Sequence, residues 1–303
     1  MTWFFQQLIN GLALGSIYAL IALGYTMVYG VLRFINFAHS DVLMLGAFAA
    51  YFLAPWVAKF LPAQSYSGAV VVIVLAAAIC AVIGMLIELL AYRPLRSRPK
   101  LTVLITAIGV SLFIEYTCQH KKVFGAATQP FPQLLPHQNF QIASLSVDSN
   151  DLTVLVITAL LLVGMWFIVQ KTKTGTAMRA VAFNDRAAAL MGINVNRIIS
   201  FTFALGSSLA AVAGVFYAMR APGIEPLMGV QPGLRAFTAA VVGGIGNLPG
   251  AALGGLLLGL LETYAGGIPG VSNYRDGIAF AILILILLFK PAGLLGKAQV
   301  EKV

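Results

Sequence analysis

The sequence predicts an all-α polytopic membrane protein with about eight transmembrane helices. Hydrophobic residues make up 60% of the 303 residues, charged residues only 10%, and the mean hydropathy is +0.92. A soluble domain carries about 25% charged residues, so this composition is typical of a protein that lies mostly in lipid. Apolar runs of the length that crosses a bilayer, about 20 residues, recur along the chain between short polar segments. We expect these runs to form a single transmembrane domain over residues 1–303.

The apolar runs place the individual spans. Six runs are long enough to cross, the second of them broken late by Pro55, and residues 277–289 form a further span near the end of the chain. In the first run Gly11 and Gly15 lie four residues apart, a spacing that favours close packing of helices. Residues 120–151 have a mixed polar composition with three prolines and no helical period, which predicts a loop. The six spans are residues 8–32, 42–60, 67–91, 101–118, 152–169 and 199–219.

Residues 235–265 differ from the other apolar runs. The stretch before Gly243 is too short to cross a bilayer, and Gly243, Gly244, Gly246 and Pro249 interrupt it. Irregular backbone at membrane depth is tolerated only inside protein or beside a water-filled cavity. The segment therefore predicts a broken or re-entrant hairpin. Its glycines are typical of close helix packing, and a break that lines a transport pathway is the alternative.

The distribution of lysine and arginine predicts the orientation, because cytoplasmic loops carry an excess of these residues. The basic residues lie between apolar runs rather than along one amphipathic face, so the net charge of +9 does not indicate nucleic-acid binding. Thirteen basic residues fall on one side and six on the other, which predicts an external N-terminus and a cytoplasmic C-terminus. The external six are Lys59, Lys121, Lys122, Arg220, Arg235 and Arg275.

The polar segment 171–198 is the longest cytoplasmic loop in this topology. Asn184 or Asp185 can cap a helix N-terminus, Ala187 to Met191 are mostly strong helix formers, and Gly192 stands where a left-handed glycine would end the helix. Asn194 or Asn196 can cap the next helix. So short a helix is not stable alone in water, and we expect it to dock onto a cytoplasmic partner. A basic loop that contacts anionic lipid is the alternative interpretation.

A second polar segment, residues 33–41, separates the first two spans. It carries Asn36, Phe37, His39 and Asp41, and polar residues within a membrane are costly and usually functional. One interpretation is a cytoplasmic turn in which Asp41 stabilises a helix N-terminus through the helix dipole. The other is a helix break that lines the transport route or its inner gate. We expect the carboxylates Glu88, Glu115 and Glu262 to face headgroups or other helices.

The sequence predicts neither catalysis nor a bound cofactor or metal. The three histidines are scattered, and no paired carboxylates or metalloprotease motif occur on one helix face. The glycine clusters lack the Gly-Lys-Ser/Thr ending of a phosphate-binding loop, which argues against an ATPase site in this chain. Cys80 and Cys118 lie in apolar runs and are expected to be small buried side chains.

Residues 15–30, the run Ile-Asn-Phe-Ala-His at 35–39, residues 187–194, residues 235–246 and the tail 300–303 together resemble one known family. The chain resembles the smaller permease subunit of high-affinity branched-chain amino acid ABC importers, over nearly its whole length. Ser40 and Asp41 stand where relatives commonly have Gly and then Glu, a change that keeps the acid.

The resemblance implies a subunit of a bacterial inner-membrane importer with a periplasmic N-terminus. It implies a second, homologous permease subunit in a heterodimer, two cytoplasmic ABC ATPases that hydrolyse the ATP, a periplasmic amino-acid-binding protein and surrounding membrane lipid. Asn36, Phe37 and His39 match the family's signature segment. The predicted short helix matches the ATPase-coupling helix, with candidate residues Asn184, Asp185, Arg186, Ala188, Leu190, Met191, Gly192 and Ile193.

Two alternatives remain at this point. A urea or short-amide ABC importer has permeases that share the Ile-Asn-Phe-Ala-His run. An ion-coupled secondary transporter or a channel would need deep carboxylates, a filter or inverted repeats, and the sequence has no convincing example of these.

Overall fold

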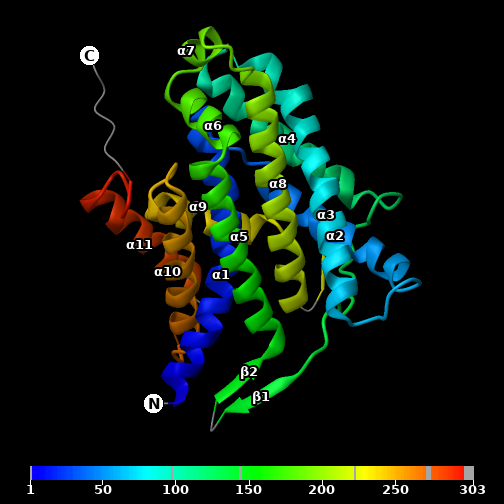
Figure 1. Cartoon of the computed structure of the whole chain (residues 1–303). Helices are drawn as coiled ribbons and strands as arrows, with labels where there is room; N and C mark the ends of the chain where they lie inside the picture. The colour runs from blue at the N-terminus through cyan, green and yellow to red at the C-terminus, as the bar shows by residue number, and fades with distance from the viewer. Residues whose placement is uncertain (1, 97, 143–144, 222, 271–273, 297–303) are drawn as a thin grey trace. The chain divides into compact units, whose positions relative to one another are not determined.

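The computed structural model (Figure 1) describes residues 2–96, 98–142, 145–221, 223–270 and 274–296. These residues form two compact units. Unit 1 comprises Met1–Thr26, His137–Leu162 and Leu234–Val303, and unit 2 comprises Met27–Pro136 and Val163–Gly233. Lys297, Lys302 and the tail 300–303 lie outside the described residues. The sequence predicts a single transmembrane domain over residues 1–303. Whether the two units act as one domain stays a prediction.

The described residues are mainly helical, as the composition predicts. A π-helical turn, Glu88–Tyr92, and a 3-10 turn, Arg93–Leu95, follow α3. The helices are α1 (Thr2–Leu32), α2 (His39–Val57), α3 (Tyr66–Ile87), α4 (Lys100–Gln119), α5 (Ser149–Lys171), α6 (Lys173–Phe183), α7 (Asp185–Leu190), α8 (Val195–Arg220), α9 (Val230–Gly243), α10 (Leu248–Gly266) and α11 (Arg275–Phe289).

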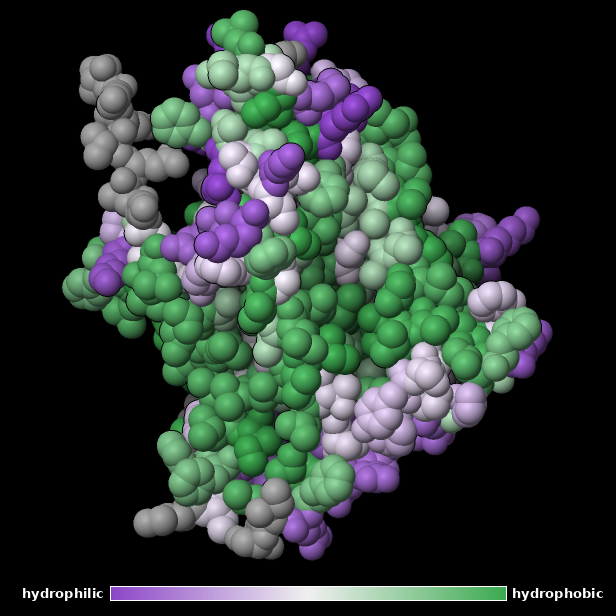
Figure 2. Space-filling model, in the orientation of Figure 1, coloured by the Kyte–Doolittle hydropathy of each residue, from purple (hydrophilic) through white to green (hydrophobic). Residues whose placement is uncertain are grey.

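Within the described part of the chain, seven helical segments are long and apolar enough to cross a membrane. They include α1, α2, α4, α5, α8 and α10, and the seventh is α3 with the two turns that follow it. Helix α11 has only 15 residues, so the predicted last span is shorter than the roughly 20 residues of a crossing helix. Apolar residues cover much of the outer surface of the helices, as Figure 2 shows.

Helices α2, α3 and α8 form the centre of unit 2 and approach each other closely at glycines. A Cβ on Gly46 of α2 would lie 2.4 Å from the Cα of Ala211 in α8. A Cβ on Gly214 would lie 2.1 Å from the carbonyl oxygen of Leu43. These distances leave no room for a side chain, so the two helices touch through their backbones. Small residues let membrane helices pack in this way.

Unit 1 uses the same device between α1 and α10. A Cβ on Gly15 would lie 2.8 Å from the Cα of Leu256, and one on Gly255 would lie 2.4 Å from the backbone nitrogen of Ala19. Gly11 also faces α10, with 3.0 Å between its ideal Cβ and the Cα of Leu260. The close-packing face expected from the spacing of Gly11 and Gly15 is therefore confirmed.

One prediction about the loops is wrong: the segment 120–151 contains a β-hairpin. Strands β1 (Asn139–Ile142) and β2 (Leu145–Asp148) pair in antiparallel register, with Asn139 opposite Asp148 and Phe140 opposite Val147. Each strand has only four residues, too few for a clear alternation of apolar and polar side chains to indicate a strand in the sequence. Cross-strand hydrogen bonds, which the sequence does not show, hold the hairpin.

The polar segment 171–198 also differs from the prediction, because it contains two helices rather than one. Helix α6 precedes α7, and the hydroxyl of Thr172 caps it by accepting a hydrogen bond from the backbone N–H of Gly175 at 3.1 Å. A Cβ on Gly175 would lie 2.2 Å from the carbonyl oxygen of Ile168 at the end of α5. Glycine is a poor helix former, and Gly175 is the third residue of α6. Close packing against α5 supplies the reason for the glycine.

Candidate functional site

Helix α7 begins and ends where the sequence predicts. The side-chain oxygen of Asn184 accepts a hydrogen bond from the backbone N–H of Ala187 at 3.0 Å, which is the geometry of an N-cap. Asp185 follows in the first turn, where its negative charge is favourable with the helix dipole. Gly192 has φ +81°, the left-handed conformation that commonly ends a helix. The six-residue helix is therefore bounded by its own sequence.

The two faces of α7 differ in burial. Ala188 is buried and Ile193 is partly buried, and both belong to the apolar cluster that also contains Phe203 of α8. Leu190 and Met191 are 89% and 84% exposed. Large apolar side chains exposed at the tip of a polar loop are typical of an interaction surface.

Helix α8 starts three residues beyond Gly192. The side-chain oxygen of Asn194 accepts a hydrogen bond from the backbone N–H of Arg197 at 3.1 Å, so the predicted second cap is present. The connection between α7 and α8 is short and both of its ends are capped. A displacement of α7 would therefore be transmitted to α8.

A cluster around Glu88 joins the end of α3 to the start of α8. The Glu88 side chain is fully buried and accepts hydrogen bonds from the Arg93 guanidinium at 2.8 Å and from the Ser200 hydroxyl at 2.6 Å. Arg96 also pairs with Glu88, and it donates a hydrogen bond to the side-chain oxygen of Asn196 at 2.9 Å.

The structure thus gives Glu88 a specific partner helix, which the sequence analysis did not identify. A carboxylate shortly before two arginines was the available signal. Nothing in the sequence indicates that Ser200, on another helix, completes the cluster. Glu88 also opens the π-helical turn, a feature that occurs frequently at functional sites.

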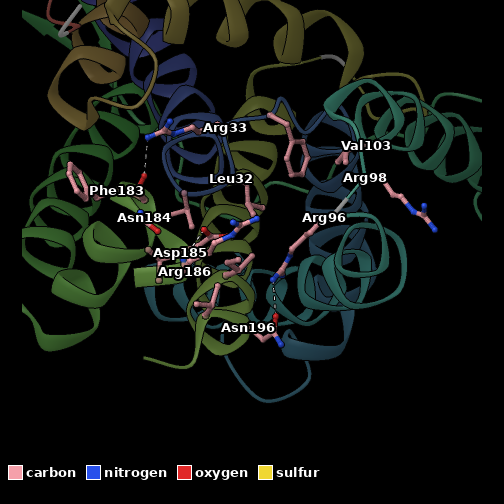
Figure 3. A pocket seen from close by; sticks show the side chains of 16 residues that line it. Leu32, Arg33, Arg96, Arg98, Val103, Phe183, Asn184, Asp185, Arg186 and Asn196 are labelled. Carbon is pink, nitrogen blue, oxygen red and sulfur yellow. Dashed lines mark hydrogen bonds between the residues drawn. The ribbon is translucent and has the colours of Figure 1, made fainter. Parts of the chain in front are cut away.

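A cavity of about 670 Å³ lies beside the N-terminal half of α7 (Figure 3). Asn184, Asp185 and Arg186 line it together with Arg33 and Arg96. Burial lowers the pKa of the Arg96 guanidinium from its ordinary value, and Glu88 acts in the opposite direction. An arginine stays charged at neutral pH under such shifts, so the cavity is positively charged.

The signature segment lies inside unit 2 between α1 and α2. Asn36 is 4% exposed, and its side-chain oxygen accepts a hydrogen bond from the Tyr92 hydroxyl at 2.6 Å. His39 and Asp41 are buried in the first turn of α2, and Ser111 of α4 donates a hydrogen bond to Asp41 at 2.5 Å. Phe37 is partly buried against the same apolar cluster as Ala188. A turn between two helices is observed, and a role in the route or gate stays a prediction.

The glycines of the predicted broken hairpin serve packing and turn geometry in unit 1. A Cβ on Gly243 would lie 2.0 Å from the carbonyl oxygen of Gly250, where α9 and α10 approach each other. Gly244 and Gly246 have φ values of +108° and +94° in the turn between these helices. Asn247 then caps α10 by accepting a hydrogen bond from the N–H of Gly250 at 3.3 Å. A role of these glycines in the pathway stays a prediction.

A buried ion pair in unit 1 was missed. Arg235 of α9 and Glu262 of α10 pair at 2.7 Å, and the Tyr18 hydroxyl of α1 donates a hydrogen bond to Glu262 at 2.7 Å. The count of basic residues places Arg235 in an external loop, but its side chain is only 16% exposed within a helix. It is therefore a poor marker of topology, and without it the external basic residues number five (six minus one).

The comparisons with known proteins give the family. Residues 7–287 match the family model described as "Branched-chain amino acid transport system / permease component". The chain is 42% identical to the high-affinity branched-chain amino acid transport system permease protein BraD of Pseudomonas aeruginosa, over 99% of this chain and 98% of that protein.

Two further relatives are a second permease of the same description and a sugar permease. The chain is 39% identical to the high-affinity branched-chain amino acid transport system permease protein LivH of Escherichia coli K12, over 99% of this chain and 98% of that protein. The ribose import permease protein RbsC of Haemophilus influenzae is 36% identical, over 40% of this chain and 39% of its own. No solved structure matches. The match over nearly the full length means that the chain belongs to the branched-chain amino acid transport system permease family.

Proposed function

We propose that this chain is the permease subunit of an ABC importer that moves branched-chain amino acids across the inner membrane. The observation that carries the proposal is the similarity over nearly the full length to two permeases described by that substrate class. The capped helix α7, with its exposed Leu190 and Met191, supports a subunit that takes its energy from a cytoplasmic partner. The ribose permease matches less than half of the chain, which favours the amino acids over a sugar.

The proposed assembly contains a second, homologous permease, two cytoplasmic ABC ATPases and a periplasmic binding protein. ATP would be hydrolysed by the ATPases, and this chain would bind no cofactor of its own. The exposed tip of α7 would dock onto one ATPase. When the ATPases close, α7 would move, and the short connection to α8 would carry that movement into the centre of unit 2. Such a switch between two packings of the permease halves gives alternating access.

The orientation follows from the basic residues. Thirteen lie on the side that carries the α6–α7 loop and five on the other, once the buried Arg235 is set aside. The excess supports a cytoplasmic α7, a periplasmic N-terminus and a cytoplasmic C-terminus.

A pull-down and an uptake assay test the proposal. Tagged full-length protein, solubilised from its native membranes, should bring down two ATPases with phosphate-binding loops and a second permease. The reconstituted complex with its cognate binding protein should then take up labelled leucine in an ATP-dependent way. Uptake of urea instead of leucine would show that the proposed substrate is wrong. Purification of a homo-oligomer without ATPases would refute the proposal of an ABC importer.

Two substitutions at Gly192 test the docking of α7. An added Cβ at Gly192 would meet nothing within 4 Å, so a side chain there would point away from the chain. Asn and Asp both tolerate the left-handed conformation better than other residues do, and they differ from each other in charge. Gly192→Asp should reduce uptake more than Gly192→Asn, because a charge would be buried against the ATPase. Equal, normal uptake by both variants would show that α7 is not the docking helix.

A further inference from the structure

We propose that the cavity beside α7 binds the phosphate headgroup of an anionic phospholipid from the cytoplasmic leaflet. We call it the arginine cavity, after the four arginines that line it: Arg33, Arg96, Arg98 and Arg186. The proposal depends on the cytoplasmic placement of α7 proposed above, and it is independent of the substrate that the permease moves.

The charge of the arginine cavity is strongly unbalanced. Four arginines line the cavity with a single acidic residue, Asp185, whose carboxylate accepts a hydrogen bond from the adjacent Arg186 backbone N–H at 2.8 Å. Glu88 pairs with both Arg96 and Arg93, so its single negative charge offsets only part of the charge of these two arginines. Clustered arginines of this kind are suited to phosphate, because each presents a planar set of hydrogen-bond donors.

Several of these donors are available to a ligand. The Nε atom of Arg96 is buried and has no hydrogen-bond partner among the described residues, an arrangement that costs free energy unless a ligand satisfies it. Arg98 and Arg186 are exposed. Figure 3 shows Arg96 reaching toward Asn196 and the α7 residues, whereas the Arg98 side chain points outward from the cavity.

Arg33 supports the assignment through its backbone. It has φ +55°, a conformation that is unfavourable for residues other than glycine and that persists only where the surroundings require it. This conformation follows the last residue of α1, and the Arg33 guanidinium makes one hydrogen bond of 3.3 Å, to the carbonyl oxygen of Ala182. A glycine at this position would end α1 without backbone strain. An arginine stands there instead, and its side chain lines the cavity.

The remaining lining residues indicate an amphiphile rather than a free phosphate. Apolar side chains line the rest of the cavity, including Leu32, Phe34, Val103 and Ile199. These residues come from the ends of α1, α4 and α8, three candidate membrane spans. A basic pocket between membrane helices on the cytoplasmic side, where headgroups lie, is the arrangement that binds anionic lipid headgroups.

The proposed lipid site and the proposed ATPase docking surface lie at different ends of α7. The exposed apolar residues Leu190 and Met191 lie at the C-terminal end of α7, whereas the cavity is lined by the N-terminal residues Asn184 to Arg186. A lipid in the cavity would therefore contact α7 at its cap and leave the tip free to dock.

Native mass spectrometry of the full-length protein in detergent, titrated with dioleoylphosphatidylglycerol, tests the proposal. Arg98→Gln and Arg186→Gln should each weaken binding about fivefold, and together roughly 30-fold, since each basic residue near a membrane surface contributes a similar share. Arg197→Gln is the matched control, because Arg197 is an exposed arginine of the same region that does not line the cavity. It should bind the lipid as the unmodified protein does.

Three other results would overturn the proposal. Binding that Arg98→Gln and Arg186→Gln leave unchanged would show that the lipid lies elsewhere. Competition by sn-glycerol 1-phosphate at the same concentration as the lipid would identify a free phosphate compound as the ligand. Loss of ATPase co-purification in these two variants, with lipid binding intact, would assign the arginines to the ATPase interface. Because both arginines are exposed, each single variant should fold, and elution in size-exclusion chromatography verifies this.

Discussion

Removal of the α7 cap by Asn184→Ala is the sharpest test of how this region works. The substitution deletes the hydrogen bond of 3.0 Å from the Ala187 N–H and leaves that N–H without its partner at the start of the helix. An Asn-to-Ala change at an N-cap costs about 1 kcal/mol. Helix α7 has six residues, far fewer than the roughly 12 needed for a marginally stable isolated helix, so it has little other local stability to lose.

The expected size of the effect follows from that free energy. About 1 kcal/mol changes the ratio of ordered to disordered α7 by roughly fivefold. If the ATPase docks only onto ordered α7, leucine uptake per ATP hydrolysed should fall by up to about the same factor. The assay is uptake and ATP hydrolysis measured together in proteoliposomes that contain the complete importer.

Two further variants separate the cap from other roles of the residue. Asn184→Asp keeps an acceptor for the Ala187 N–H and should restore uptake. Asn194→Ala removes an equivalent hydrogen bond, of 3.1 Å, from the 26-residue helix α8, whose packed length should make its loss of uptake smaller. If Asn184→Ala transports normally, or if Asn184→Asp is damaged to the same degree, the capping argument is refuted.

Three predictions concern stability, measured by thermal unfolding of the detergent-solubilised protein. Gly214→Ala should destabilise by about 1–3 kcal/mol or prevent folding, because its Cβ would meet the backbone of α2 at 2.1 Å, whereas Gly164→Ala, with nothing within 4 Å, should be tolerated. Glu88→Ala should cost about 3 kcal/mol, since two partly buried arginines lose their shared partner; a cost below that of an ordinary surface pair would contradict the cluster. Glu262→Leu should cost a similar amount, about 3 kcal/mol, by removing the carboxylate that neutralises the buried Arg235, and Arg235→Met in the same chain should recover much of it; no recovery would show that the pair is not the cause.

Local signals along the chain were sufficient for six of the seven candidate spans found in the described residues, and for the ends of α7. An apolar run needs about 20 residues to cross the lipid bilayer, and the length of such a run can be counted in the sequence. The cap at Asn184 and the left-handed Gly192 depend on backbone geometry within a few residues of each, so sequence spacing predicted them correctly. The resemblance to the permease family also depends on short continuous segments of the sequence.

Other features depend on residues that are distant in sequence, and only the folded chain decides them. Ser200 meets Glu88 across 112 positions, and Glu262 meets Tyr18 across 244. The reason for a glycine at position 175 is its close approach to the end of α5, which the sequence does not show.

The arginine cavity is of this second kind. Its cationic groups come from the end of α1, the turn after α3 and the start of α7, three places that look in the sequence like separate topology markers. Charge spacing along a chain reports which side of the membrane a residue occupies. Convergence of charges on one ligand is a property of packing, because it depends on which helix ends the buried contacts bring together.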